Sequence, residues 1–184
     1  MRKLAAYIAA APRQKLPAPV VECTKHHILD TIAAMVSGTR LPPGKIAISY
    51  ASSQGGTPEA LVVGSRCVTT VLNAAVANAM CAHADETDDS HAPSLTHPGC
   101  GIVSAALAMA ERGRRDGTAF LRAVTLGYDV SSRLTISLGG ASGGISLFMD
   151  EGRLVYEYNM MIIERYKARS TAALTPGKHT IAVH

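Results

Sequence analysis

The residues best suited to chemistry lie in one short polar segment, from His83 to His97. Within fifteen residues it holds three histidines, four carboxylates and several hydroxyl side chains. Histidine gains and loses a proton near neutral pH, and a neighbouring carboxylate can orient its ring. Such a set suits removal of a proton from a carbon beside a carboxylate, followed by departure of a leaving group. We therefore expect an acid–base site that uses Asp88, Asp89 and His97.

Two other interpretations of this segment remain open. Asp, Ser and Thr residues in front of a helix can serve only as caps and turn residues, and for Asp85 this is as plausible as a functional role. Alternatively, Asp88, His91 and His97 could bind Zn²⁺ or Mn²⁺ in a metal-dependent hydrolase. Histidine pairs that bind metals on helices usually lie four residues apart, whereas this set lies in a loop. The sequence thus favours a site without a metal.

Helices are predicted on both sides of the polar loop. Apolar residues recur at helical spacing in stretches that cover residues 17–38, 43–53, 68–84, 100–112 and 117–138. Pro98 opens the helix after the loop, where a missing N–H costs little, and Asp116 is placed to cap the next helix. Residues 4–11 indicate an amphipathic first helix and not a signal peptide. A loop held at both ends by packed helices can keep its side chains in fixed geometry.

The pattern changes after residue 138. Residues 139–144 are rich in glycine and predict a linker, and beyond them apolar residues alternate with polar ones. Strands are expected over residues 145–149, 154–158, 161–168 and 178–183, with a hairpin turn at 150–152. The expected fold is therefore mainly α. It has an all-helical domain over residues 1–138 and a short antiparallel β segment over residues 145–184.

Composition excludes several classes of partner. Hydrophobic residues make up 47% of the chain, enough for a packed core. The net charge of +4 is scattered, and the basic cluster at residues 112–115 follows a predicted helix end, so no nucleic acid is expected. No apolar run approaches the roughly 20 residues that cross a membrane. The four cysteines form no CxxC pair, and we expect a reducing, cytoplasmic location.

One known family has a signature similar to the polar segment. The match consists of His83-Ala-Asp-Glu-Thr-Asp-Asp-Ser-His91 followed by Thr96-His97-Pro-Gly. These motifs resemble those of the MmgE/PrpD family. Further stretches resemble that family in the same order, and they are residues 29–38, 58–64, 74–78, 106–111 and 127–133. The resemblance covers residues 1–138.

The resemblance implies a lyase that acts on a small polycarboxylate. The family includes 2-methylcitrate dehydratase and cis-aconitate decarboxylase, which would place the chain in propionate catabolism. Its members have a large helical domain and a smaller lid domain, are usually homodimers, and work without an iron–sulfur cluster or organic cofactor. We therefore expect no cofactor. The implied site residues are His97, Asp88 and Asp89 for catalysis, and Glu86, Ser90 and His91 for substrate binding.

Two departures from the family pattern affect these expectations. Glu86 stands where the family often has Asp, and Ser90 stands where Thr is usual. Family members are much longer chains, and a lysine, a tyrosine and further histidines of their active sites come from later segments. We therefore expect a truncated domain with reduced or lost activity, and a non-catalytic remnant or interaction protein is the alternative.

The C-terminal segment resembles a different family. Residues 143–184 are similar to the C-terminal β region of arylsulfatases, over runs such as Gly144–Asn159 and Leu174–Thr180. That region lies far from the sulfatase nucleophile and metal site. The resemblance therefore implies a fusion or a disrupted gene, and it does not imply sulfatase activity.

Overall fold

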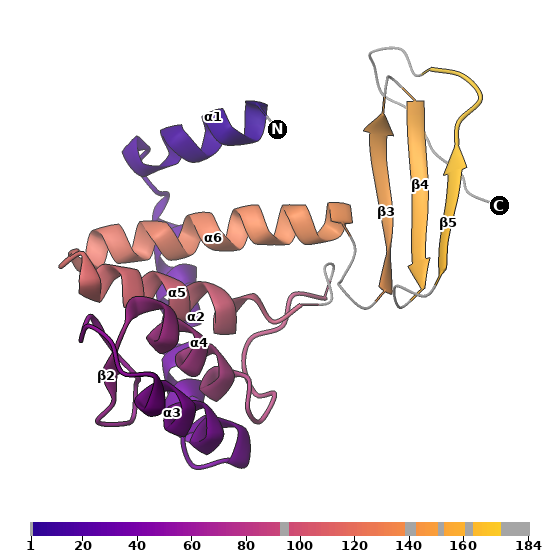
Figure 1. Cartoon of the computed structure of the whole chain (residues 1–184). Coiled ribbons are helices and arrows are strands. Elements are labelled where there is room, and N and C mark those ends of the chain that lie inside the picture. Colours follow the sequence, from indigo (N-terminus) through magenta and orange to yellow (C-terminus); the bar gives the residue numbers. More distant parts are fainter. Residues whose placement is uncertain (1, 93–95, 139–142, 151–152, 161–163, 174–184) are drawn as a thin grey trace. The chain divides into compact units, whose positions relative to one another are not determined.

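The computed structural model describes residues 2–92, 96–138, 143–150, 153–160 and 164–173 (Figure 1). The chain forms two compact units, Met1–Ser132 and Arg133–His184. The first unit contains the polar loop and the helices that hold it. The described secondary structure is mainly α-helical, as predicted.

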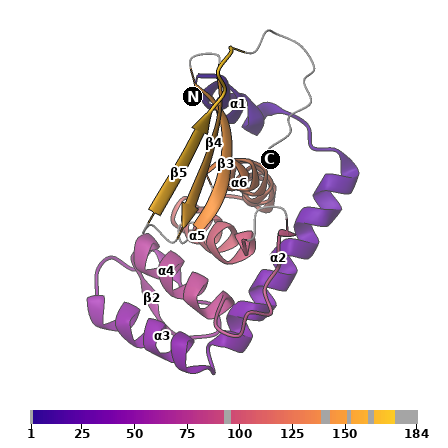
Figure 2. The same ribbon diagram turned by 90° about the vertical axis from the view of Figure 1, so that its right-hand side faces the viewer.

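Helices make up most of the first unit. Their bounds are α1 (Arg2–Ala10), the 3₁₀ helix η1 (Ala11–Arg13), α2 (Ala18–Gly38), α3 (Pro42–Gln54), α4 (Val71–Ala82), α5 (Pro98–Arg112) and α6 (Gly117–Leu138). Helix α4 packs against α2, α3 and α5 (Figure 2). Proline stands in the first turn of α2, α3 and α5, where a helix has no use for the missing N–H. The helices predicted from apolar spacing are therefore confirmed, apart from small differences at their ends.

One helix boundary differs from the prediction. The sequence predicted a helix from residue 68, but β2 (Val68–Thr69) pairs there with β1 (Ala60–Leu61) in an antiparallel hairpin. Helix α4 begins only at Val71, and the Thr70 hydroxyl accepts a hydrogen bond from the Asn73 N–H at 3.3 Å. Threonine is a favoured helix cap, so the helix starts after this residue and the two residues before it are free to pair.

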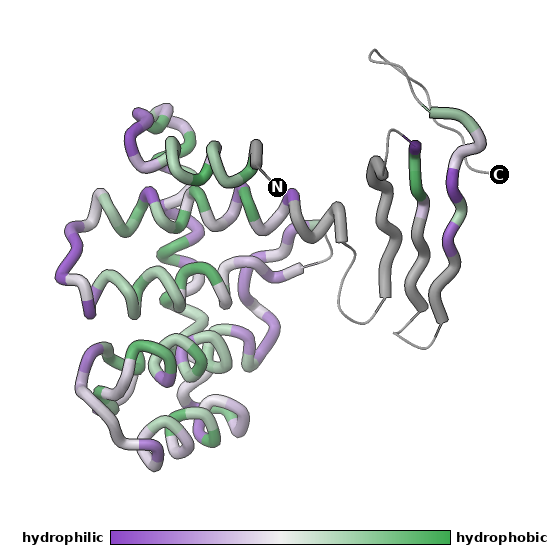
Figure 3. The backbone as a smooth tube through the Cα atoms, turned by 45° about the horizontal axis from the view of Figure 1, so that its top comes forward, coloured by the Kyte–Doolittle hydropathy of each residue, from purple (hydrophilic) through white to green (hydrophobic). Residues whose placement is uncertain are grey.

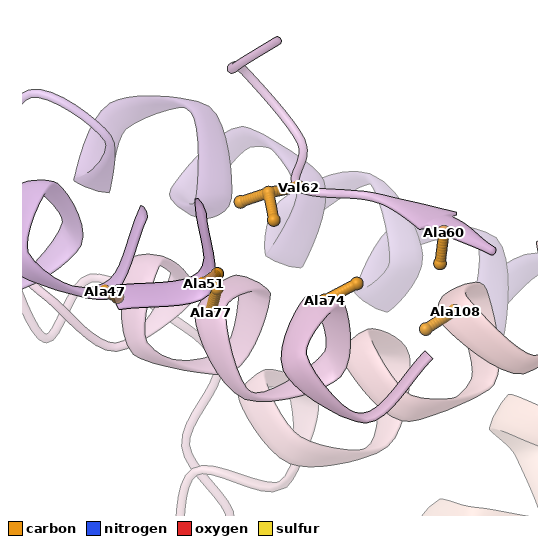
Figure 4. Packing of buried hydrophobic residues seen from close by; sticks show 7 residues of the cluster. All are labelled: Ala47, Ala51, Ala60, Val62, Ala74, Ala77 and Ala108. Carbon is orange, nitrogen blue, oxygen red and sulfur yellow. The ribbon is translucent and has the colours of Figure 1, made fainter. Parts of the chain in front are cut away.

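The core is built largely from small side chains. One buried cluster joins α3, the β1–β2 hairpin, α4 and α5, and it comprises Ala47, Ala51, Ala60, Val62, Ala74, Ala77 and Ala108 (Figure 4). A second cluster contains Met35, Ala82, Val103 and Val124. Small side chains let helix backbones approach closely, and this holds α4 firmly against its neighbours at the point where the polar loop leaves it.

The second unit contains a three-stranded antiparallel sheet. Its strands are β3 (Gly143–Asp150), β4 (Arg153–Met160) and β5 (Glu164–Arg169), in the order β3–β4–β5. Asp150 pairs with Arg153 and Ile145 with Tyr158. The first three predicted strands are confirmed, with shifted ends, and the last two residues of the predicted linker belong to β3. The fourth predicted strand, the rest of the linker and part of the hairpin turn lie outside the described residues.

The helices mix polar and apolar residues along their length. Figure 3 shows hydrophobic and hydrophilic positions interspersed in the helices of the first unit. Among the described residues, no helix combines the length and the apolar character needed to cross a membrane.

The close approach of α2 and α4 generates a stability prediction. A Cβ atom at Gly38 would overlap the carbonyl oxygen of Cys81 and lie 3.1 Å from the Ala84 Cβ. Gly38→Ala must therefore push the helices apart, and we expect it to lower the free energy of unfolding by about 1–3 kcal/mol. Urea unfolding followed by circular dichroism measures the change.

Gly101→Ala is the matched control. Gly101 lies in α5, and a Cβ there would meet nothing within 4 Å. Because alanine favours the helix, we expect this change to raise the free energy of unfolding by about 0.5–1 kcal/mol. Equal effects of the two substitutions would contradict the proposed close contact.

Candidate active site

The polar loop leaves α4 at His83 and is tied to its surroundings by short hydrogen bonds. Asp85 accepts hydrogen bonds from the Thr87 hydroxyl at 2.8 Å and from the Ser37 hydroxyl of α2 at 3.1 Å. The bond from Thr87, followed by that from Ser37, lowers the pKa of Asp85. Further along, the His91 N–H donates to the Thr96 carbonyl at 2.9 Å. The contacts of Asp85 are those of a turn residue, in agreement with the structural interpretation.

The centre of the site is a buried carboxylate between two imidazole rings. The His83 Nδ1 lies 3.2 Å from Asp88 Oδ1 and 3.3 Å from Oδ2, and the His97 Nδ1 lies 3.3 Å from Oδ1. The ring centroids of the two histidines are 4.9 Å apart. The Asp88 side chain is 0% exposed, whereas those of His83 and His97 are 46% and 34% exposed. The imidazoles therefore lie between a buried anion and solvent.

His97 lies within ion-pair distance of Asp88 but forms no hydrogen bond with it. Its Nδ1 atom is buried and has no hydrogen bond of acceptable geometry, although Asp88 is within ion-pair distance. Since Nδ1 of each ring faces Asp88, Nε2 is the nitrogen left to exchange a proton with a bound molecule. The Nδ1 atoms of both rings therefore face the same carboxylate.

Cys100 lies next to this cluster, and its surroundings keep the thiol protonated. Its thiol donates to the His97 carbonyl at 3.0 Å. Burial, with a further contribution from the negative charge of Asp88, raises the pKa of Cys100 to about 11. The thiol therefore stays protonated at neutral pH, and the thiolate is the reactive form.

Asp89 faces the other way and anchors the loop. Its Oδ1 accepts the Gly99 N–H at the start of α5 at 2.8 Å, and its Oδ2 accepts the Tyr128 hydroxyl of α6 at 2.7 Å. His27 of α2 places its Nδ1 3.5 Å from the same Oδ2 and its ring 4.7 Å from that of Tyr128. Asp89 therefore joins the loop to three helices, in the manner of a helix cap.

Gly99 is required for this junction. A Cβ atom there would overlap Asp89 Oδ1 and lie 2.6 Å from the Thr31 hydroxyl and 2.7 Å from the Tyr128 hydroxyl. Burial, followed by the hydrogen bond to Asp89, raises the pKa of Tyr128, so its hydroxyl remains a donor. The His-Pro-Gly sequence at residues 97–99 thus places His97 directly beside a tightly packed helix start.

The other predicted site residues lie around this centre. Glu86 and Ser90 are exposed, and Glu86 has a left-handed backbone with φ of 54°. His91 is half-buried and pairs through its backbone with Thr96. The structure brings together Asp88 and His97 from the predicted set.

His83 and Tyr128 contribute to this site and were not predicted from the sequence to do so. His83 was seen as part of the segment but was given no role, although it follows α4 directly and so has a fixed position. Tyr128 belongs to a motif that resembled the family, but its partner Asp89 lies 39 residues earlier in the chain.

An open groove borders His97. It has a volume of about 640 Å³, lies between α5 and α6, and is lined by His97 and Thr96 together with apolar residues such as Ile102 and Met109. The site is thus accessible from solvent along this side of the first unit.

Comparison with known protein families identifies the family of this chain. The model of the MmgE/PrpD N-terminal domain matches residues 2–156. The match therefore extends past residue 138 and into β4, and nothing supports the resemblance of residues 143–184 to arylsulfatases. The search of curated proteins gave no match.

The anchoring role of Asp89 predicts a large stability effect. Asp89→Ala leaves the Gly99 N–H and the Tyr128 hydroxyl without their acceptor, at a carboxylate whose side chain is 10% exposed. We expect a loss of about 2–4 kcal/mol in the free energy of unfolding. Chemical denaturation measures it.

Asp116→Ala provides the comparison. Asp116 also accepts a helix N–H, that of Ala119 at 2.8 Å, but it is exposed. Its loss should cost about 0.5–1 kcal/mol. If the two variants unfolded at the same denaturant concentration, Asp89 would be an ordinary surface cap.

Proposed function

We propose that this chain, which belongs to the MmgE/PrpD family, carries the acid–base centre of a lyase for a small polycarboxylate. The default substrate is 2-methylcitrate or a similar acid, and the reaction is dehydration. The observation that supports the proposal most directly is the placement of the buried Asp88 carboxylate against Nδ1 of both His83 and His97.

Dehydration needs two proton transfers, and two imidazoles are present for them. In the proposed reaction the C–H bond beside a substrate carboxylate breaks and its proton passes to Nε2 of His97. The carbon–carbon double bond forms as the carbon–oxygen bond breaks, and the hydroxyl leaves as water with a proton from His83. Asp88 holds both rings in position. General acid–base catalysis of this kind typically contributes about 10²–10⁴-fold to a rate.

The exposed residues of the loop complete the proposed site. Glu86 and Ser90 lie at the solvent side, where they could bind the hydroxyl and carboxylate groups of a substrate. Asp89 supports catalysis only through position, because it holds the start of α5 next to His97. In this proposal the proton transfers are carried out by the imidazole groups, and Asp88 supports them.

A second candidate is a non-catalytic role in association, including formation of a homodimer. Several large apolar side chains are strongly exposed on the helices, and they are Leu29 (67%), Ile46 (66%), Leu72 (70%) and Met109 (56%). Apolar surface of this kind often marks an interface with another chain. Light scattering coupled to size exclusion separates a defined dimer from a monomer.

The lyase proposal predicts a strong dependence on His97. With 2-methylcitrate as substrate, chromatography of the unsaturated product should show turnover, and His97→Asn should reduce it by about 10²–10⁴-fold because the proton acceptor is lost. His26→Asn is the matched control, since His26 is exposed on α2. We expect it to leave turnover unchanged.

Two outcomes would overturn the proposal. Equal turnover in His97→Asn and the unchanged protein would remove His97 from the mechanism. A folded protein that binds and converts no polycarboxylate would remove the lyase activity, and a defined dimer in that case would favour the association role.

A further inference from the structure

We propose that His83, Asp88 and His97 form a binding site for a divalent transition-metal ion, with Zn²⁺ as the best match. Each of the three residues offers one ligand atom, and these atoms lie within 4.8 Å of one another. The metal would bind to imidazole nitrogens and to a carboxylate oxygen. This is the donor set that zinc and its neighbours in the first transition row prefer.

The distances fit a tetrahedral ion. Ligands about 2.0–2.2 Å from zinc at tetrahedral angles are separated by roughly 3.3–3.5 Å. The two histidine Nδ1 atoms lie 3.2 Å and 3.3 Å from Asp88 Oδ1. Two edges of the tetrahedron are therefore already close to the required length, and the third separation between ligand atoms is at most 4.8 Å.

The state of the donor atoms supports binding as well. The Nδ1 of His97 is buried and has no hydrogen bond of acceptable geometry, so a ligand atom there displaces no partner. The Asp88 side chain is 0% exposed, and its described contacts are with the two imidazoles and the Cys100 thiol, with no lysine or arginine among them. A divalent cation would supply the charge compensation that a buried carboxylate needs.

The surroundings favour a preformed site with one open position. His83 directly follows α4, and His97 directly precedes α5, so two helices fix the backbone of both imidazoles. Three protein ligands leave a fourth position for water or a substrate oxygen. Since both rings remain partly exposed, that position would face solvent.

This ligand set differs from the one predicted from the sequence. The metal-binding alternative considered from the sequence had His91 as the third ligand, whereas the described structure groups His83 with Asp88 and His97. Binding of the ion stands on this geometry and is independent of the proposed lyase activity. If the lyase proposal also holds, metal bound at Nδ1 would change the proton chemistry of both imidazoles and so alter the rate.

Metal titration of the chelator-treated protein tests the proposal. Calorimetry with Zn²⁺ should show one ion per chain, and Co²⁺ should give the visible absorption of a tetrahedral site. Asp88→Asn and His83→Ala should each weaken binding by roughly 100-fold or more, because even groups that only support a ligand contribute about 10–100-fold. Circular dichroism confirms that each variant is folded.

His91→Ala and His26→Ala are the controls, because each removes a histidine and leaves the proposed ligands in place. We expect both to bind Zn²⁺ with unchanged affinity and stoichiometry. Absence of stoichiometric metal would overturn the proposal, as would a larger loss in His91→Ala than in His83→Ala. Turnover measured with and without chelator is read separately, so failure of the lyase proposal leaves the binding result intact.

Discussion

The site depends on the hydrogen bond between the Asp89 carboxylate and the Gly99 N–H at the start of α5. This bond places a charged acceptor at the positive end of a helix and, through Tyr128, fastens the same carboxylate to α6. His97 is two residues before Gly99 and has little freedom once that junction has formed. The preceding carboxylate, Asp88, is then free to face the imidazoles.

Two adjacent carboxylates therefore have opposite tasks. Asp88 lies against two partly exposed rings, while Asp89 lies against backbone and phenol groups inside the helical unit. The two roles fall on consecutive residues, because the anchoring Asp89 directly follows Asp88 of the imidazole cluster. A substitution of Asp89 is therefore also expected to shift Asp88, because one peptide bond joins the two residues.

Much of this structure could be predicted from the sequence, because a helix can be recognised from the spacing of apolar residues that are close together in the chain. Apolar residues at helical intervals and proline at helix starts gave α2, α3, α5 and α6 close to their observed ends. Strand β2 was missed because Val68 and Thr69 also fit a helical pattern, and their pairing with residues 60–61 depends on tertiary contacts. The Asp89–Tyr128 bond and the turn of His83 toward Asp88 depend on packing, which local spacing does not encode.

The left-handed backbone of Glu86 has an effect on how the loop can vary. Aspartate tolerates this conformation better than glutamate, because its short side chain can hydrogen-bond locally. The resemblance to the family implies aspartate at this place, so glutamate gives the acidic group a longer reach at a higher backbone conformational energy. A substitution at this position thus changes two properties at once, the reach of the acidic group and the conformational energy of the loop backbone.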